Sequence, residues 1–120
     1  MTDSHPPVTD GHWHRICDGN ELNGTQCREF VVADTPGFAF RHQGEVRAFI
    51  NRCPHLGIEL NWMPDRFFDL EQTFIQCSTH GALFLPQTGH CIAGPCAGEH
   101  LVALPVREQD GQVEVCVSPD

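Results

Sequence analysis

The sequence contains no lysine and no tyrosine, and its charge is strongly one-sided. Sixteen acidic residues stand against seven basic ones, all of them arginine, which gives a formal net charge of -9. Nucleic acids and anionic membranes are bound through a basic face. The composition therefore predicts neither as a partner, and it favours attraction to a basic protein surface instead.

Long hydrophobic runs are also missing. No stretch approaches the roughly 20 consecutive apolar residues that a membrane-spanning helix needs. The first ten residues are polar and contain Pro6 and Pro7, unlike a secretory signal peptide. We therefore expect a cytoplasmic protein in which residues 1–11 form a flexible N-terminus and residues 12–118 form a single domain.

Seven cysteines are present, an odd number, and no secretion signal accompanies them. In a reducing compartment such cysteines are expected to be metal ligands or buried thiols rather than a disulfide framework. Cys116 alternates with valine, as expected of a residue on one face of a strand. Cys91 and Cys96 flank a Gly-Pro turn, and whether they pair is left open by the sequence.

Short runs of aromatic and β-branched residues alternate with turn residues along most of the chain. They predict an all-β fold, an antiparallel sandwich or barrel. The expected strands cover residues 12–17, 27–33, 38–41, 46–50, 73–76, 82–85, 101–106 and 113–117, and turns are expected at 35–37, 42–44 and 108–112.

Two short motifs pair a cysteine with a histidine. One is C-x-H, formed by Cys53 and His55, and the other is C-x-x-H, formed by Cys77 and His80. Two thiolates and two neutral imidazoles complete the first coordination shell of a soft or borderline metal. The same four ligands suit a tetrahedral zinc ion or a 2Fe-2S cluster in which histidines replace two cysteines. Zinc loops more often use C-x-x-C or H-x-x-x-H, which the sequence lacks, so the cluster is favoured.

From about Trp13 to Val117 the sequence resembles the Rieske ferredoxins, small proteins that feed ring-hydroxylating oxygenases. The resemblance implies a cluster-binding subdomain of two loops, at about residues 51–97, within a Rieske-like sandwich. It also implies that Cys53 and Cys77 bind the inner iron of one 2Fe-2S cluster. His55 and His80 would then bind the outer iron. Gly94 and Pro95 match the turn that covers the cluster in this family.

The resemblance further distinguishes two branches of the family. Respiratory-chain members brace the cluster with a disulfide between the loops, and the corresponding positions here are Ile58 and Thr79. They also place hydroxyl groups where this chain has Ala82 and Phe84. The ferredoxin branch is therefore implied, with a reduction potential near the lower end of the family's range of roughly -150 to +300 mV.

The interval between the two motifs is several residues longer than in common members of the family. The extra residues lie at about 61–71, which we expect to form a long loop or one helical turn. The aromatic residues Trp62, Phe67 and Phe68 are expected to pack within that loop. A longer loop reshapes the partner surface, so the resemblance leaves the identity of the oxygenase open.

The expected function is that of a one-electron carrier, not itself an enzyme, between a reductase and an oxygenase or another terminal enzyme. One alternative is a small subunit of a larger reductase, similar to that of assimilatory nitrite reductase. A second alternative, from another class, is an interaction module stabilised by zinc.

Overall fold

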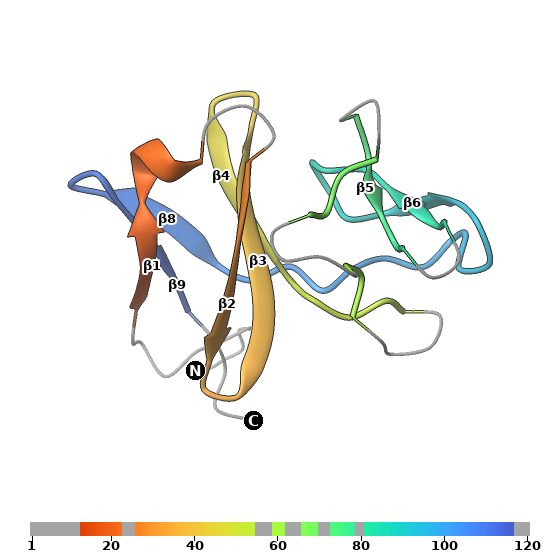
Figure 1. Ribbon diagram of the computed structural model, residues 1–120, viewed down its shortest axis with the longest axis horizontal. Coiled ribbons are helices and arrows are strands. Elements are labelled where there is room, and N and C mark those ends of the chain that lie inside the picture. The colour runs from red at the N-terminus through yellow and green to blue at the C-terminus, as the bar shows by residue number, and fades with distance from the viewer. Residues whose placement is uncertain are drawn as a thin grey trace, which may run out of the picture.

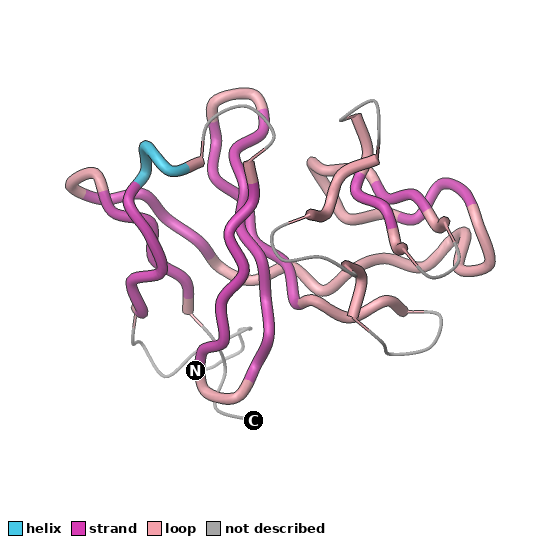
Figure 2. Tube along the Cα trace, viewed as in Figure 1, coloured by secondary structure: helices cyan, strands magenta, loops and turns pink. Residues whose placement is uncertain are grey.

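The chain forms two lobes of short strands that lie side by side (Figure 1). The computed structural model describes residues 13–22, 26–54, 59–61, 66–69, 73–78 and 81–116. The larger part, called the base lobe, contains β1–β4, β8 and β9, and the cysteine lobe contains β5–β7. The molecule measures 37 × 32 × 23 Å along its principal axes. Strands and loops make up almost all of the described chain (Figure 2), which confirms the all-β prediction.

The base lobe consists of two antiparallel sheets. One sheet has the order β1-β9-β8 and the other the order β2-β3-β4. Their strands are β1 (His14–Asp18), β9 (Gln112–Val115), β8 (Val106–Gln109), β2 (Cys27–Val32), β3 (Thr35–His42) and β4 (Glu45–Ile50). A short 3-10 helix, η1 (Gly19–Glu21), follows β1.

Main-chain hydrogen bonds join the two sheets along β4. The N–H of Ile50 donates to the carbonyl of Val102 at 2.9 Å, and the N–H of Leu104 donates to Ala48 at 2.9 Å. The expected strand at 101–106 is therefore wrong in its extent, because only an isolated bridge at Ala103 precedes β8. Residues 101–105 run along the edge of β4 and lead into β8, so they connect the two sheets of the base lobe.

Two-residue turns join the strands of the base lobe. Positive φ angles occur at both Ala33 and Asp34, and at the equivalent positions of the β3–β4 and β8–β9 hairpins. This pattern is typical of type I′ turns, whose twist suits antiparallel strands. The turn expected at 35–37 is wrong, because those residues begin β3. Gly37 is small for a packing reason: a Cβ atom there would lie 2.5 Å from the ring of Phe30 on the opposite strand.

β3 separates two hydrophobic cores and is buried on both faces. Phe38, Ala39 and Phe40 are each fully buried. Successive side chains of a strand point to opposite faces. Ala39 accordingly packs with Val113 in the base lobe, whereas the two phenylalanines pack toward the cysteine lobe. The cysteine lobe therefore rests on a strand that is fixed from both sides.

Phe67 and Phe68, in the long interval between the motifs, pack on this same strand. The ring of Phe67 stacks on Phe38 with centroids 4.0 Å apart and planes at 7°, and Phe68 meets Phe40 edge-on at 5.4 Å. Phe67 is 1% exposed. The prediction of packing within the loop is wrong for both residues, while Trp62 lies outside the described residues. Residues 66–69 contain no helical turn.

The cysteine lobe has a small antiparallel sheet of order β5-β6-β7. β5 (Ile75–Gln76) and β6 (Leu83–Phe84) lie within the expected strands, and β7 (Cys91–Ala93) was not expected. Among the described residues, no helix has the length and apolar character of a membrane span.

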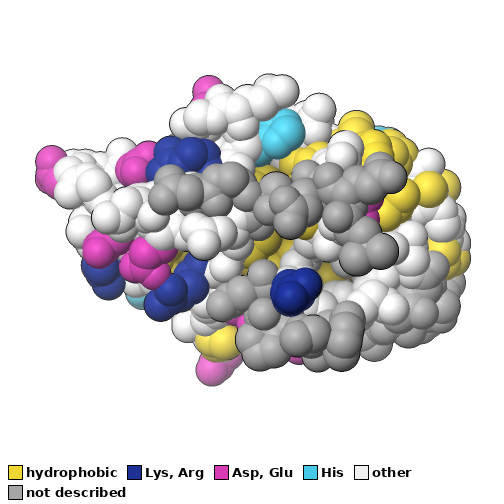
Figure 3. All heavy atoms as spheres, turned by 45° about the horizontal axis from the view of Figure 1, so that its top comes forward, with side chains coloured by type: hydrophobic (Ala, Val, Ile, Leu, Met, Phe, Trp, Pro, Cys, Tyr) yellow, Lys and Arg dark blue, Asp and Glu magenta, His cyan; other side chains and the backbone are white. Residues whose placement is uncertain are grey.

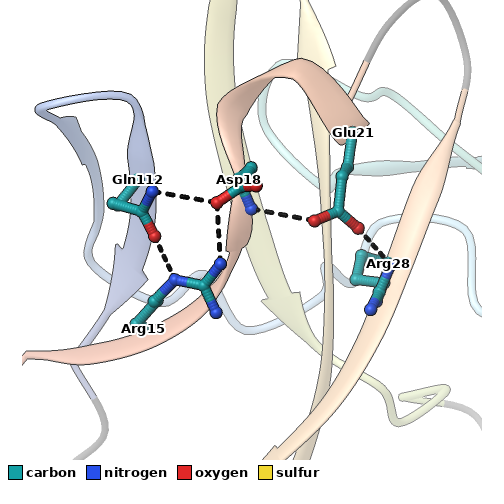
Figure 4. A network of polar contacts seen from close by, with 5 residues as sticks. All are labelled: Arg15, Asp18, Glu21, Arg28 and Gln112. Carbon is teal, nitrogen blue, oxygen red and sulfur yellow. Dashed lines mark hydrogen bonds and ion pairs between the residues drawn. The ribbon is translucent and has the colours of Figure 1, made fainter.

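A polar network links the strands at the far side of the base lobe (Figure 4). Asp18 accepts hydrogen bonds from Gln112 at 2.9 Å and from Arg15 at 2.7 Å, and its own N–H donates to Glu21 at 3.1 Å. Glu21 in turn pairs with Arg28 on β2. These contacts connect β1, β2, β9 and η1, and they lie in the base lobe, away from the two cysteine motifs.

Candidate metal centre

The two motif cysteines lie where strands enter the cysteine lobe. Cys53 follows the end of β4 by three residues, and Cys77 directly follows β5. Cys53 is 1% exposed and Cys77 is fully buried, and both belong to the same hydrophobic cluster. Neither of the two is in a disulfide bond. The structure therefore presents two buried sulfur donors at the ends of well-anchored strands.

The motif histidines, His55 and His80, lie outside the described residues. Within the described part of the chain, no three side chains of histidine, cysteine, aspartate or glutamate are grouped as metal ligands. The positions of the imidazoles thus stay a prediction from the sequence.

The second motif lies in a loop that closes on itself. The N–H of Cys77 donates to the carbonyl of Ala82 at 2.9 Å, and the N–H of Gly81 donates back to the carbonyl of Cys77 at 2.8 Å. Gly81 has a φ of 72°, a conformation that glycine adopts without strain. The short spacing of C-x-x-H followed by glycine therefore forms a tight turn with Cys77 at its base.

A main-chain hydrogen bond connects the two loops. The N–H of Ser78 donates to the carbonyl of Leu60 at 2.7 Å. The N–H of Leu60 in turn donates to Oδ1 of Asn51 at 2.8 Å. Because Asn51 precedes Cys53 and Leu60 follows the first motif, these bonds tie the two ends of the first loop and join it to the second.

A third segment, the turn at Gly94 and Pro95, contacts both loops. Gly94 has a φ of 102°, and a Cβ atom there would lie 2.7 Å from Cα of Ala82. Cys96 is fully buried, and Cys53 is among the neighbours that raise the pKa of its thiol, which places the two residues close together. The three segments therefore meet in pairs around the buried sulfur atoms.

Cys96 lies at this centre, whereas the sequence had indicated only a possible pairing with Cys91. Its only signal was its position directly after the Gly-Pro turn. Burial raises the pKa of its thiol to about 12, helped by the neighbouring sulfur atoms of Cys91 and Cys53. The thiol is therefore protonated at neutral pH and can act as a weak hydrogen-bond donor.

The remaining candidate residues behave as the sequence predicted. Cys116 is buried, with 3% exposure, beside the end of β9. Cys17 is buried in the core of the base lobe, and Cys27, on β2, is buried in the same hydrophobic cluster as Cys53 and Cys77.

The surface differs between the two lobes. On the face shown in Figure 3, acidic and basic side chains gather mainly over the base lobe, at the left, and hydrophobic atoms are visible over the cysteine lobe, at the right. Exposed hydrophobic side chains among the described residues include Ile92 on β7, at 45%, and Val102, at 55%. Ile92 thus gives the cysteine lobe an exposed apolar side chain, and Val31 on β2, at 71%, gives the base lobe one as well.

Comparison with known proteins agrees with this arrangement. The family model described as "Rieske [2Fe-2S] domain" matches residues 12–115. Cholesterol 7-desaturase of Caenorhabditis elegans is 31% identical over 91 residues, which are 75% of this chain and 21% of that protein.

Two solved structures illustrate the fold. The terminal oxygenase of carbazole 1,9a-dioxygenase from Novosphingobium sp. KA1 superposes with a TM-score of 0.77 and 24% identity, over 93% of this chain and 31% of its own. The ferredoxin of carbazole 1,9a-dioxygenase from Nocardioides aromaticivorans IC177 has a TM-score of 0.73 and 23% identity, over 90% of this chain and 100% of its own. The chain thus spans about a fifth of the desaturase and about a third of the oxygenase.

Proposed function

This chain belongs to the Rieske [2Fe-2S] domain family, and we propose that it passes single electrons from a reductase to an oxygenase or another terminal redox enzyme. Membership of this family implies the cofactor, which is one 2Fe-2S cluster. The observation that carries the proposal is the burial of two cysteines outside any disulfide bond, Cys53 and Cys77, at the base of two loops that are tied together. In this proposal the chain has no catalytic site of its own.

The proposed ligands are Cys53 and Cys77 for the inner iron and His55 and His80 for the outer iron. The burial of the two thiols fits them to the inner iron, away from water. The bound cluster supplies a one-electron couple whose added electron is expected on the iron with the neutral imidazole ligands. The two histidines would then provide the contact through which an electron leaves and the site at which a proton is taken up.

The residues around the cysteines determine how the proposed cluster is held. Ile75 and Phe84 are fully buried in the same cluster of side chains and keep water from the sulfur atoms. Ala82 has no hydroxyl group to donate to a sulfur atom. A buried site with few donors disfavours the more negative, reduced state, which supports a potential at the lower end of the family's range.

The proposed partners are proteins: a reductase that donates and an oxygenase or other enzyme that accepts. The net charge of -9 supports steering toward basic protein surfaces rather than toward nucleic acid or membrane. The exposed apolar side chain of Ile92 in the cysteine lobe supports close contact with a partner. We propose the cytoplasm as the location, because this carrier chemistry suits a reducing compartment.

The test combines spectroscopy with substitution. Protein purified without air and reduced with dithionite is expected to give a rhombic electron paramagnetic resonance signal with the low average g-value of mixed His/Cys ligation. A one-electron reversible wave is expected by voltammetry. A colourless protein with one zinc ion per chain would overturn the proposal.

Variants identify the ligands. His55→Ala and His80→Ala are each expected to abolish the signal. His90→Ala and His100→Ala are the controls, because these histidines are exposed in the cysteine lobe and are expected to leave the spectrum unchanged. Retention of the full visible spectrum in either ligand variant would exclude that residue as a ligand.

A further inference from the structure

Asn51 stands out because it is the one polar residue that is buried among those the structure describes, at 3% exposure. A buried amide without hydrogen bonds destabilises a protein, because it has lost its bonds to water, so such a group needs partners within the protein. Asn51 precedes Cys53 by two residues, and its N–H donates to the carbonyl of Pro36 at 2.9 Å. Its main chain is thereby fixed to β3, immediately before the first motif.

The side chain of Asn51 begins a relay of hydrogen bonds with one direction. Its Oδ1 accepts from the N–H of Leu60 at 2.8 Å, and its Nδ2 donates to Oδ1 of Asn61 at 2.9 Å. Nδ2 of Asn61 then donates to Oε2 of Glu29, on β2, at 2.6 Å. The relay thus connects a carboxylate of the base lobe to the main chain at the end of the first loop.

The same relay reaches the second loop. The carbonyl of Leu60, whose N–H is held by Asn51, accepts from Ser78, the neighbour of Cys77, at 2.7 Å. The side chain of Asn51 therefore acts on the segments that carry both motif cysteines. The bond to the carboxylate is charge-assisted, so it is the strongest of the series and orients the two amides.

We propose that Asn51 is a positioning residue for the metal centre: it closes the first cysteine loop and, through Leu60, sets the position of Cys53 relative to Cys77. The role rests on the proposed function, because the two cysteines are its proposed ligands. The carboxylate of Glu29 fixes the amide of Asn61 with Nδ2 toward Glu29, and the N–H of Leu60 requires the oxygen of the Asn51 amide to face the loop.

Because the hydrogen bonds of the relay have a direction, one substitution can break it and a second substitution can restore it. Asn51→Asp keeps an acceptor for Leu60 but places a carboxylate oxygen against Oδ1 of Asn61, so the relay is broken. If Glu29 is changed to glutamine as well, Asn61 can turn its amide to donate to Asp at 51 and accept from Gln at 29. The double variant keeps the bond from the N–H of Leu60 and restores the two bonds of the Asn61 amide in the opposite direction, with the same net charge as the wild type.

The experiment compares the wild type, Asn51→Asp, Glu29→Gln and the double variant. Cluster loss is followed anaerobically as bleaching of the visible absorbance in the presence of an iron chelator, and the midpoint potential is measured by voltammetry. Asn51→Asp is expected to lose the cluster at least tenfold faster and to shift the potential. The double variant is expected to return to within about threefold of the wild type.

Glu59→Gln is the matched control, because Glu59 is exposed and lines the same surface hollow of about 230 Å³ as Glu29 and Asn51. It removes the same charge without touching the relay and is expected to behave as the wild type. Wild-type behaviour of Asn51→Asp, or a double variant no better than Asn51→Asp, would overturn the proposed role.

A second measurement separates this inference from the proposed function. Hydrogen exchange, read by mass spectrometry on peptides that cover residues 59–61 and 77–82, reports the loop bonds whether or not iron is present. Asn51→Leu is expected to exchange faster than the wild type in both peptides, and unchanged exchange would overturn the relay. Iron and sulfide analysis of the wild type decides the cofactor independently.

Discussion

The sulfur atoms of Cys91 and Cys96 lie 3.1 Å apart, in a buried position where both residues are free thiols. Cys91 also directs its thiol to the carbonyl of Ala93 at 3.2 Å. Because Cys53 is among the neighbours that raise the pKa of the Cys96 thiol, the pair lies beside the centre on the side of the Gly-Pro turn. The question that the sequence left open is thus answered by a hydrogen-bonded pair of thiols.

Replacing Cys96 is expected to lower the reduction potential. A thiol that donates to a ligand sulfur stabilises the more negative, reduced state, and Cys96→Ala removes this donor. The expected decrease is on the order of 20–40 mV, the one-electron equivalent of a hydrogen bond of ~0.5–1 kcal/mol. Voltammetry measures it, and Cys17→Ala is the control because Cys17 is buried in the core of the base lobe. An unchanged potential in Cys96→Ala would contradict the contact.

Replacing Gly94 is expected to separate the covering turn from the second loop. In Gly94→Ala the new Cβ atom would lie 2.7 Å from Cα of Ala82 and 3.0 Å from Cβ of Ala82. The substitution would also strain the backbone, because φ at this position is 102°. Gly98→Ala is a close match, since Gly98 has a φ of 96° and no atom within 4 Å of the added carbon.

Both variants are measured by urea unfolding. Gly98→Ala is expected to lower the free energy of unfolding by roughly 1–2 kcal/mol, from backbone strain alone. Gly94→Ala is expected to lower it clearly further, and its cluster to be lost faster. Equal effects of the two substitutions would show that the contact with Ala82 is unimportant.

Removing the ring of Phe67 is expected to be strongly destabilising. Phe67 is almost fully buried and stacks on Phe38, so Phe67→Ala should lower the free energy of unfolding by about 3–5 kcal/mol. Phe68→Ala is the comparison, because Phe68 is only partly buried and should have a smaller effect. A loss below about 1 kcal/mol for Phe67→Ala would contradict the anchoring of the long interval on β3.

An ion pair in the base lobe gives a prediction about pH. Arg41 donates to the carboxylate of Glu108 through Nη1 at 2.9 Å and through Nη2 at 3.0 Å. Its Nε donates to the carbonyl of Leu22 at 3.0 Å. The hydrogen bond from Arg41 holds the pKa of the Glu108 carboxyl below its usual value of 4.5. A lowered pKa in the folded state stabilises the protein at pH values above 4.5, and this stabilisation is lost as the pH falls through the folded-state pKa.

Glu108→Gln tests this contribution. The wild type is expected to be more stable than Glu108→Gln at pH 7, and the difference should disappear in acid, as measured by urea unfolding at a series of pH values. Glu45→Gln is the control, because Glu45 is 74% exposed in its ion pair with Arg47 and should show little dependence on pH. A difference between wild type and Glu108→Gln that is constant with pH would refute the assignment.

Several features were determined by the sequence because they depend on neighbouring residues. Alternation of apolar residues with turn residues was sufficient to predict the all-β class and most strands. The spacing of Cys53 and Cys77 with their histidines was sufficient to predict the centre, and the alternating run before Cys116 was sufficient to predict β9, although Cys116 itself lies just beyond its end. Each of these patterns is local, so the chain displays it before any tertiary contact is considered.

Other features were decided by the tertiary structure alone. Thr-Pro-Gly at 35–37 is a strong turn signal, yet these residues begin β3. Gly37 is small there because the ring of Phe30, on the neighbouring strand, occupies the space that a Cβ atom would need. Phe67 belongs to the core because Phe38, far away in the sequence, offers it a face. The proposed roles of Cys96 and Asn51 likewise depend on residues distant in the sequence, Cys53 for Cys96 and Leu60 for Asn51. A contact between distant residues leaves no periodic trace along the chain, because its geometry arises only when strands are packed against one another.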